Sequence, residues 1–323
     1  MTARRLRTIF LGTPEFAIPS LRALVGAADV AAVVTQPDKP RGRGRQVEAP
    51  PVAREAAALG LPLLQPPRLR APEVIEQLRA LRPDVLVIAA YGKIVPRELL
   101  ELPPLGPVNV HPSLLPKYRG ASPIESAILH GETGTGVTIM YLAMELDAGD
   151  IILQRRVPIE PDDTARTLEA KLARVGAEAL VEALRLIAEG RAPRIPQDAS
   201  QSTYAGKLEK EHGRIDWARS GADLVNLIRA MDPWPSAFTY HRGRLLKVWR
   251  AAAHPELKGA PGTVLAVRPG EGIVVGTGEG ALRLLEVQPE GGRRMTADEF
   301  ARGARLTPGE RLGDAATSAG KPV

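Results

Sequence analysis

The first half of the chain alternates apolar runs with segments of helical periodicity, and this alternation restricts the fold more than any other feature of the sequence. It opens with a predicted strand at 8–11, a helix at 16–25 and a strand at 30–36. Strands that alternate with helices pair in parallel, and helices cover both faces of their sheet. The sequence therefore predicts an α/β fold with a doubly wound, mostly parallel sheet, of the Rossmann-like kind.

The same alternation continues to Gly190, where the longest helical pattern ends. The further predicted helices are 72–81, which has a proline in its first turn, and 164–188, which is rich in alanine and leucine. The further predicted strands are 84–89, 108–111, 138–141 and 150–157. We expect residues 1–190 to form one domain.

The second half of the chain has a different pattern. A stretch without periodicity, RAPRIPQDASQS, predicts a linker at 191–208. A predicted helix at 222–230 then precedes short strands between glycine turns, and a late helix lies near Thr296. The strands are expected at 237–240, 244–250, 262–267, 272–275 and 281–287. Residues 209–323 therefore form, by this prediction, a small β-barrel domain of the oligonucleotide-binding kind.

Composition limits the function and the location. The chain has no cysteine, which excludes disulfides, thiolate nucleophiles and sulfur-ligated zinc and fits a reducing compartment. Its five histidines lack the close helical spacing of a metal site, so no metal is expected. The apolar start of the chain is too short for a signal peptide or a transmembrane span, and we expect a cytoplasmic protein with no membrane or protein partner. A net charge of +6 suits an anionic partner such as nucleic acid.

The most informative segment is VNVHPSLLPKYRG at 108–120. Asn109 and His111 are two residues apart on a predicted strand, so their side chains emerge on one face, and Pro112 ends the strand. An amide and an imidazole at the carboxyl end of a parallel strand suit acyl transfer. The alternative is that both are hydrogen-bonded polar residues with no catalytic role.

In a second polar segment, MELDAGD at 144–150, two acids, Asp147 and Asp150, flank an Ala-Gly pair. Asp147 could orient and charge a histidine. It could equally be an ordinary aspartate of a turn.

Two groups of cations are candidates for RNA binding. In the first, the loop 37–46, the cations alternate with proline and glycine on backbone that can bend around a phosphate chain. Its members are Lys39, Arg41, Arg43 and Arg45. The second group lies on a predicted hairpin of the barrel and comprises Arg242, Arg244, Lys247 and Arg250. Either group could instead be a solvated surface.

Together, NVHPSLLPKYRG and the later LDAGD resemble the signature of folate-dependent formyltransferases. Four further segments resemble the members of that family that act on methionyl-tRNA. They are FLGTPEFA at 10–17, QPDKPRGRGR at 36–45, IDW at 215–217 and IRAMDPWPSA at 228–237. The resemblance extends over nearly the whole chain, except for about the last thirty residues.

This resemblance implies a reaction and a set of roles. The reaction is transfer of the formyl group of 10-formyltetrahydrofolate to the α-amino group of methionyl-initiator tRNA. Asn109, His111 and Asp147 would form the catalytic trio, and His111 could act as acid, base or charge stabiliser. The folate carrier would contact Ser113, Leu114, Leu115 and Pro116. The cations of the loop would grip the acceptor end of the tRNA, for which the barrel would be a second binding domain.

Two other functions remain open at this point. A formyltransferase that acts on a small amine, such as the glycinamide ribonucleotide enzyme, shares the N-x-H-P-S-L-L-P core but resembles only the first half of the chain. A non-catalytic RNA-binding protein could use the barrel and the basic loop, but it leaves Asn109, His111 and Asp147 unexplained.

Overall fold

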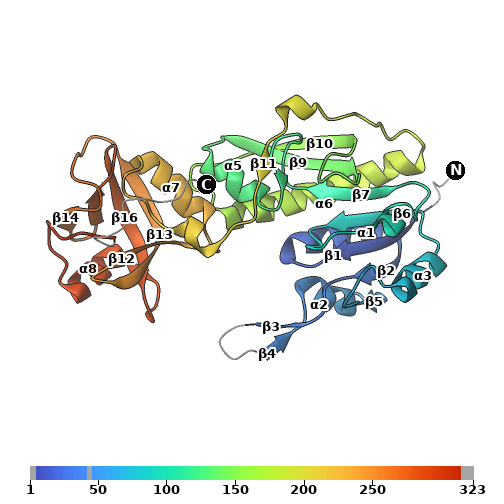
Figure 1. Ribbon diagram of the computed structural model, residues 1–323, viewed down its shortest axis with the longest axis horizontal. Helices are drawn as coiled ribbons and strands as arrows, with labels where there is room; N and C mark the ends of the chain where they lie inside the picture. The colour runs from blue at the N-terminus through green and yellow to red at the C-terminus, as the bar shows by residue number, and fades with distance from the viewer. Residues whose placement is uncertain (1–4, 42–45, 314–323) are drawn as a thin grey trace. The chain divides into compact units, whose positions relative to one another are not determined.

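A computed structural model describes residues 5–41 and 46–313 of the chain (Figure 1). By their contacts the residues divide into two compact units. The first unit comprises the residues up to Pro123, together with Gly134–Pro158 and Glu169–Ala205. The second comprises Ile124–Thr133, Ile159–Leu168 and the residues from Gly206 onward. The predicted domain limits, 1–190, 191–208 and 209–323, remain a prediction.

A 7-stranded sheet forms the centre of the first unit, in the order β10-β9-β7-β6-β1-β2-β5. The pairs from β5 to β7 are parallel, whereas β9 runs antiparallel to β7 and to β10. The bounds are β1 Arg7–Gly12, β2 Asp29–Val34, β5 Leu63–Leu64, β6 Val85–Ala89, β7 Pro107–His111, β9 Gly134–Tyr141 and β10 Ile151–Pro158. The sheet is mostly parallel, as predicted.

Helices pack on this sheet, and three of them, α1, α2 and α3, have a proline at their first or second residue, where its missing N–H leaves no hydrogen bond unmade. The helices are η1 Glu15–Ala17, α1 Ile18–Ala27, α2 Pro51–Ala58, α3 Pro72–Ala80, α4 Arg97–Leu100 and α6 Ala165–Ala188. The core beneath α3 is apolar and contains the fully buried Ile9, Leu11 and Leu86. On α6, Gly176 lies so near β7 that an added Cβ would be 2.9 Å from Cγ1 of Val110. The helix therefore supports the strand that carries Asn109 and His111.

Two short strand pairs were not predicted. β3, Lys39–Arg41, pairs antiparallel with β4, Gln46–Glu48, in the segment expected to be a loop. The proline and glycine residues of this segment interrupt the alternation of apolar and polar residues that would have predicted a strand. β8, Arg119–Gly120, pairs in parallel with β11, Tyr204–Ala205, and so ties the predicted linker to the first unit. The linker also contains the turn η2, Ala199–Gln201.

An antiparallel sheet in the order β12-β13-β16-β15-β14 forms the second unit, and β17 pairs with β16. The segment at Arg311 and Leu312 bridges to Thr263, before β14, and to His241, at the end of β12. It thus joins the two edges of the curved sheet, which confirms the predicted barrel. The strands are β12 Ala237–His241, β13 Arg244–His254, β14 Val264–Arg268, β15 Gly272–Gly276, β16 Ala281–Pro289 and β17 Met295–Thr296. The helices are α5 Pro123–Leu129, η3 Lys210–Gly213, α7 Gly221–Ala230 and α8 Ala297–Ala304.

The long predicted elements are all present, with ends that move by a few residues. The largest differences are at β9, which begins at Gly134 instead of residue 138, and at β13, which continues to His254 through two bulges instead of ending at residue 250. Within residues 5–41 and 46–313, no helix is long and apolar enough to cross a lipid bilayer.

Candidate active site

Strand β7 holds Asn109 and His111 on one face, because residues two apart in a strand point the same way. The strand is fixed by β6 on one side and β9 on the other. Only 9% of Asn109 and 4% of His111 is exposed. The side-chain amide of Asn109 has no hydrogen-bond partner among the described residues, so both its polar atoms are available to a substrate.

The hydrogen bond of His111 fixes which of its nitrogens carries a proton. Nε2 donates to the backbone oxygen of Tyr118 at 2.9 Å, because a carbonyl oxygen can only accept. In the neutral ring Nδ1 is then the free base, and it lies 3.7 Å from Oδ2 of Asp147. Burial lowers the pKa of His111, and the Asp147 carboxylate and the Tyr118 oxygen oppose that shift. Burial is the largest cause, so the free protein holds a neutral imidazole whose protonated form is stabilised by Asp147.

Asp147 lies in the loop between β9 and β10, where its backbone is left-handed with φ 50°. Its Oδ2 accepts a hydrogen bond of 2.8 Å from the backbone N–H of Gly120. The following Gly149 passes so close to β9 that an added Cβ would be 1.8 Å from the oxygen of Tyr141. This contact explains the Ala-Gly pair, since a side chain at residue 149 would displace the loop and Asp147 with it.

The predicted folate contacts form the turn after β7. Thr138 of β9 holds this turn, because its Oγ1 donates to the oxygen of Ser113 at 2.7 Å and accepts from the N–H of Leu115 at 3.1 Å. Ser113 and Leu115 are buried, while Leu114 and Pro116 are partly exposed. A bound ligand could therefore reach Leu114 and Pro116 directly, whereas Ser113 and Leu115 shape the turn.

Two polar residues next to the site were missed by the sequence analysis. Arg119 is 2% exposed, and its guanidinium donates to Oε1 of Gln197 from Nε at 3.1 Å and from Nη2 at 2.9 Å. Gln197 comes from the predicted linker, far along the chain, and no local pattern in RAPRIPQDASQS identifies it. Arg119 lies within the segment 108–120 that was singled out from the sequence, and a charged residue in such a segment was the available signal.

The four cations of the predicted RNA-binding loop are only partly described. Lys39 is exposed, and its Nζ donates to Oε1 of Gln36 at 2.6 Å. Arg41 ends β3. Arg43 and Arg45 lie outside the described residues. Their role in binding RNA remains a prediction.

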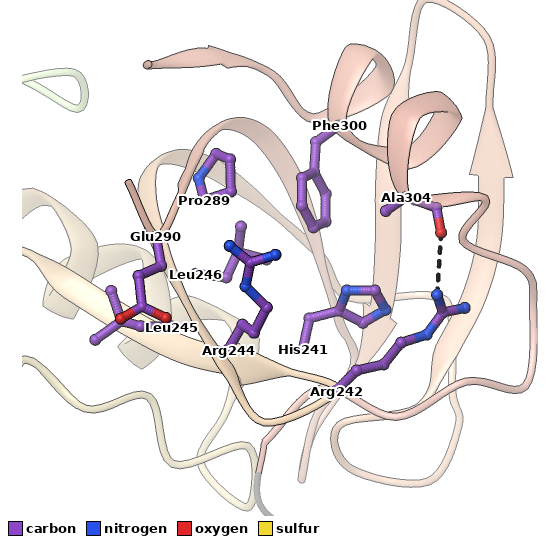
Figure 2. Close-up of a pocket in the computed structure, with 9 residues that line it drawn as sticks. All are labelled: His241, Arg242, Arg244, Leu245, Leu246, Pro289, Glu290, Phe300 and Ala304. Atoms are coloured by element: carbon purple, nitrogen blue, oxygen red, sulfur yellow. Dashed lines mark hydrogen bonds between the residues drawn. The ribbon is translucent and has the colours of Figure 1, made fainter. Parts of the chain in front are cut away.

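A cavity of about 360 Å³ opens in the second unit, with His241 and Phe300 in its wall (Figure 2). Arg242, at its edge, donates to Oε2 of Glu310 at 2.9 Å and to the oxygen of Ala304 at 3.2 Å. Backbone and side-chain donors, the N–H of Thr307 first, lower the pKa of Glu310 to about 2. Arg242 is thus hydrogen-bonded within the barrel. Arg244, another cation of the predicted basic hairpin, also lines this cavity (Figure 2).

No group of three or more metal-ligating side chains occurs in the part of the chain that the structure describes. The polar atoms beside β7 are instead an amide, an imidazole and a carboxylate. Such a set can hold a developing oxyanion and move a proton, which are the two requirements of acyl transfer to an amine.

Comparison with known proteins identifies the family. The family model described as "Formyl transferase" matches residues 7–184, and "Formyl transferase, C-terminal domain" matches residues 207–305. A protein of Symbiobacterium thermophilum named methionyl-tRNA formyltransferase is 52% identical over 311 residues, which is 95% of each chain. The protein of that name from Myxococcus xanthus is 50% identical and covers 95% of this chain and 98% of its own length.

Solved structures agree on the fold. A variant of HypX from Aquifex aeolicus matches 95% of this chain and 49% of its own, with a TM-score of 0.65 at 21% identity. WlaRD, a sugar 3N-formyl transferase, matches 88% of this chain and 98% of its own, with a TM-score of 0.64 at 18% identity. From the matches along both halves of the sequence, the chain belongs to the formyl transferase family.

Proposed function

We propose that this chain transfers the formyl group of 10-formyltetrahydrofolate to the α-amino group of methionyl-initiator tRNA. Relatives that carry this activity in their names are about half identical over 95% of the chain. The observation that carries the proposal is the free amide of Asn109 beside a buried His111 whose Nδ1 faces Asp147. The cytoplasm is the proposed location, since a chain without cysteine suits a reducing compartment.

Asn109 stabilises negative charge in this reaction. When the amine attacks the formyl carbon, the carbonyl π electrons move to its oxygen and an oxyanion forms. The amide N–H of Asn109 donates to that oxyanion, and no other described residue competes for this donor. One donor of this kind contributes about 3 kcal/mol to transition-state stabilisation in comparable sites.

His111 moves the proton. The attacking amine becomes cationic and must lose a proton, and the neutral Nδ1 of His111 is the lone pair that can accept it. Asp147 stabilises the imidazolium that results, at 3.7 Å. The same proton then passes to N10 of the folate as the oxyanion reforms the carbonyl and the bond from carbon to N10 breaks, so that tetrahydrofolate leaves with a neutral N10 amine and the formyl group remains on the acceptor amine.

The folate is proposed to contact the turn of Leu114 and Pro116 and the loop of Asp147. In that loop the large apolar side chains of Met144 and Leu146 are 73% and 60% exposed. Exposed apolar surface next to polar catalytic groups is typical of a ligand site. A flat heteroaromatic ring system could cover both side chains.

The tRNA is proposed to contact the basic hairpin around β3 and β4. If its arginines meet phosphates, binding weakens with salt, because each contact releases condensed counterions. Replacing Arg41, Arg43 and Arg45 together by alanine should flatten the salt dependence of tRNA affinity by as much as about two to three units. Folate affinity should stay unchanged. Parallel salt plots with equal intercepts for the two proteins would assign this hairpin to the solvated surface.

A small amine is the second candidate acceptor, since the glycinamide ribonucleotide enzyme shares the core motif. Relatives named methionyl-tRNA formyltransferase, which are 52% and 50% identical over 95% of this chain, favour the tRNA acceptor. The structural likeness to the sugar formyltransferase WlaRD supports the fold. At 18% identity it carries no information about the acceptor.

One assay separates these functions. The full chain is incubated with 10-formyltetrahydrofolate and, in parallel, with charged initiator tRNA, with glycinamide ribonucleotide, with uncharged tRNA or with no acceptor. We expect release of tetrahydrofolate only with the charged tRNA. Turnover with glycinamide ribonucleotide alone would identify a small-amine enzyme, and RNA binding without any transfer would identify a binding protein.

A further inference from the structure

We infer that Gln197 is a positioning residue of the formyl-transfer site: its side chain holds the backbone of the loop that carries Asp147. This inference rests on the proposed function, because its readout is the transfer reaction. Gln197 lies in the segment between the two matched family regions, at 185–206, to which neither model assigns anything.

Every polar atom of the Gln197 side chain has a partner at the site. Nε2 donates to the backbone oxygen of Asp147 at 2.8 Å and to that of Gly149 at 2.8 Å. Oε1 accepts from Nε and Nη2 of Arg119. Carbonyl oxygens require a donor and a guanidinium requires an acceptor, so these partners fix the orientation of the amide. A glutamate, which has the same shape but carries a negative charge, could accept from Arg119 but could not donate to the two carbonyl oxygens.

These bonds close a ring around Asp147. Its carboxylate is held by the N–H of Gly120, which is covalently next to Arg119. Arg119 binds Gln197, and Gln197 binds the backbone of Asp147. The carboxylate and the backbone of one residue are thus fixed to the same short segment, β8 and its neighbours. An ion pair from Nη1 of Arg119 to Oε1 of Glu145, at 3.1 Å, attaches the beginning of the loop as well.

The loop needs such support because it contains no strand or helix between β9 and β10. Asp147 itself has a left-handed φ of 50°, a conformation that is uncommon for residues other than glycine and that the surrounding contacts must maintain. Gln197 is in turn anchored, because its neighbour Ile195 exchanges two backbone hydrogen bonds with Ile151 at the start of β10. The amide therefore acts as a fixed clamp on the loop.

The consequence is a dependence of turnover on Gln197 that operates through Asp147. Without the clamp the loop shifts, the carboxylate moves from Nδ1 of His111, and the imidazolium loses stabilisation. Displacements of about 1 Å can reduce rates about a hundredfold when a reacting group is misplaced. Because Gly120 still holds the carboxylate, we expect a smaller loss, about tenfold in kcat.

The test uses the full chain with Gln197→Ala and Gln197→Glu. The glutamate keeps the acceptor for Arg119 but presents oxygen instead of N–H to two carbonyl oxygens. We expect kcat to fall about tenfold in both variants, while KM for folate and for charged tRNA stays within about twofold. Gln201→Ala is the matched control, since Gln201 is an exposed glutamine of the same segment that donates only to Asp198. Its kinetics should equal those of the wild type.

A double-mutant cycle separates positioning from a general structural role. If Gln197 acts through the Asp147 carboxylate, Gln197→Ala should reduce kcat by less than about twofold when Asp147 is already asparagine. A full tenfold further loss in that background would overturn the inference. So would wild-type kcat in Gln197→Ala. A wild-type protein that transfers no formyl group would instead contradict the proposed function.

Discussion

Replacing Asp147 by asparagine removes one charge from the site and little else. The asparagine oxygen can still accept from the N–H of Gly120, so the loop keeps its position. At 3.7 Å and an effective dielectric constant of about 20, a carboxylate and an imidazolium attract each other by about 4 kcal/mol. If half of this attraction is expressed in the transition state, about 2 kcal/mol is lost and the rate falls about thirtyfold.

The same substitution changes the pH dependence. Burial already lowers the pKa of His111, and Asp147 is the group that opposes this effect by its charge. Asp147→Asn therefore lowers the pKa further, because it removes the favourable partner of the protonated ring. The neutral imidazole is the base, so activity falls as pH drops through this pKa. The acid limb of kcat/KM should move to lower pH in the variant.

The assay is formyl transfer to charged initiator tRNA across a pH series for both proteins, with thermal unfolding to check the fold. A variant with wild-type turnover and an unmoved acid limb would refute the electrostatic role. Asp147 would then be the ordinary turn aspartate.

Three further predictions concern single residues. Asn109→Ala should lower kcat about a hundredfold or more with tRNA affinity retained, and near-normal turnover would remove the oxyanion role. Gly149→Ala should lower activity and should lower the free energy of unfolding by about 2 kcal/mol or more, because the new Cβ would lie 1.8 Å from the oxygen of Tyr141. Unfolding by urea measures the change in stability, and an unchanged midpoint would contradict the prediction. Glu310→Gln should reduce stability at neutral pH. The folded pKa of Glu310 is lowered to about 2, so its stabilisation is present above the unfolded value and is lost as pH falls from about 4.5 to about 2. A deficit in thermal stability that persists below that range would contradict the assignment.

The sequence predicts those parts of the site that follow from local periodicity. Asn109 and His111 are found on one face because the side chains of a strand alternate. Asp147 is separated from them by a long stretch of chain, so spacing carries no information about its place, and the family resemblance supplied it. Gln197 had no such signal, because its partners lie dozens of residues earlier and its own segment has no period.

The fold, too, has parts that the sequence predicts and parts that it does not. Apolar runs identify the strands of the first sheet but not their directions, because the chain between β7 and β9 is long enough to return either way. The antiparallel β9 and the short hairpin of β3 and β4 are therefore properties that only the structure reveals.

The measurement that tests the central claim most directly is a single-turnover reaction with excess protein, labelled 10-formyltetrahydrofolate and methionyl-initiator tRNA. After the tRNA ester is hydrolysed, the wild type should yield labelled N-formylmethionine. His111→Ala should yield it at least about a hundredfold more slowly while it binds the tRNA with nearly unchanged affinity. Equal rates for the two proteins, or label that never reaches the methionine nitrogen, would contradict the account.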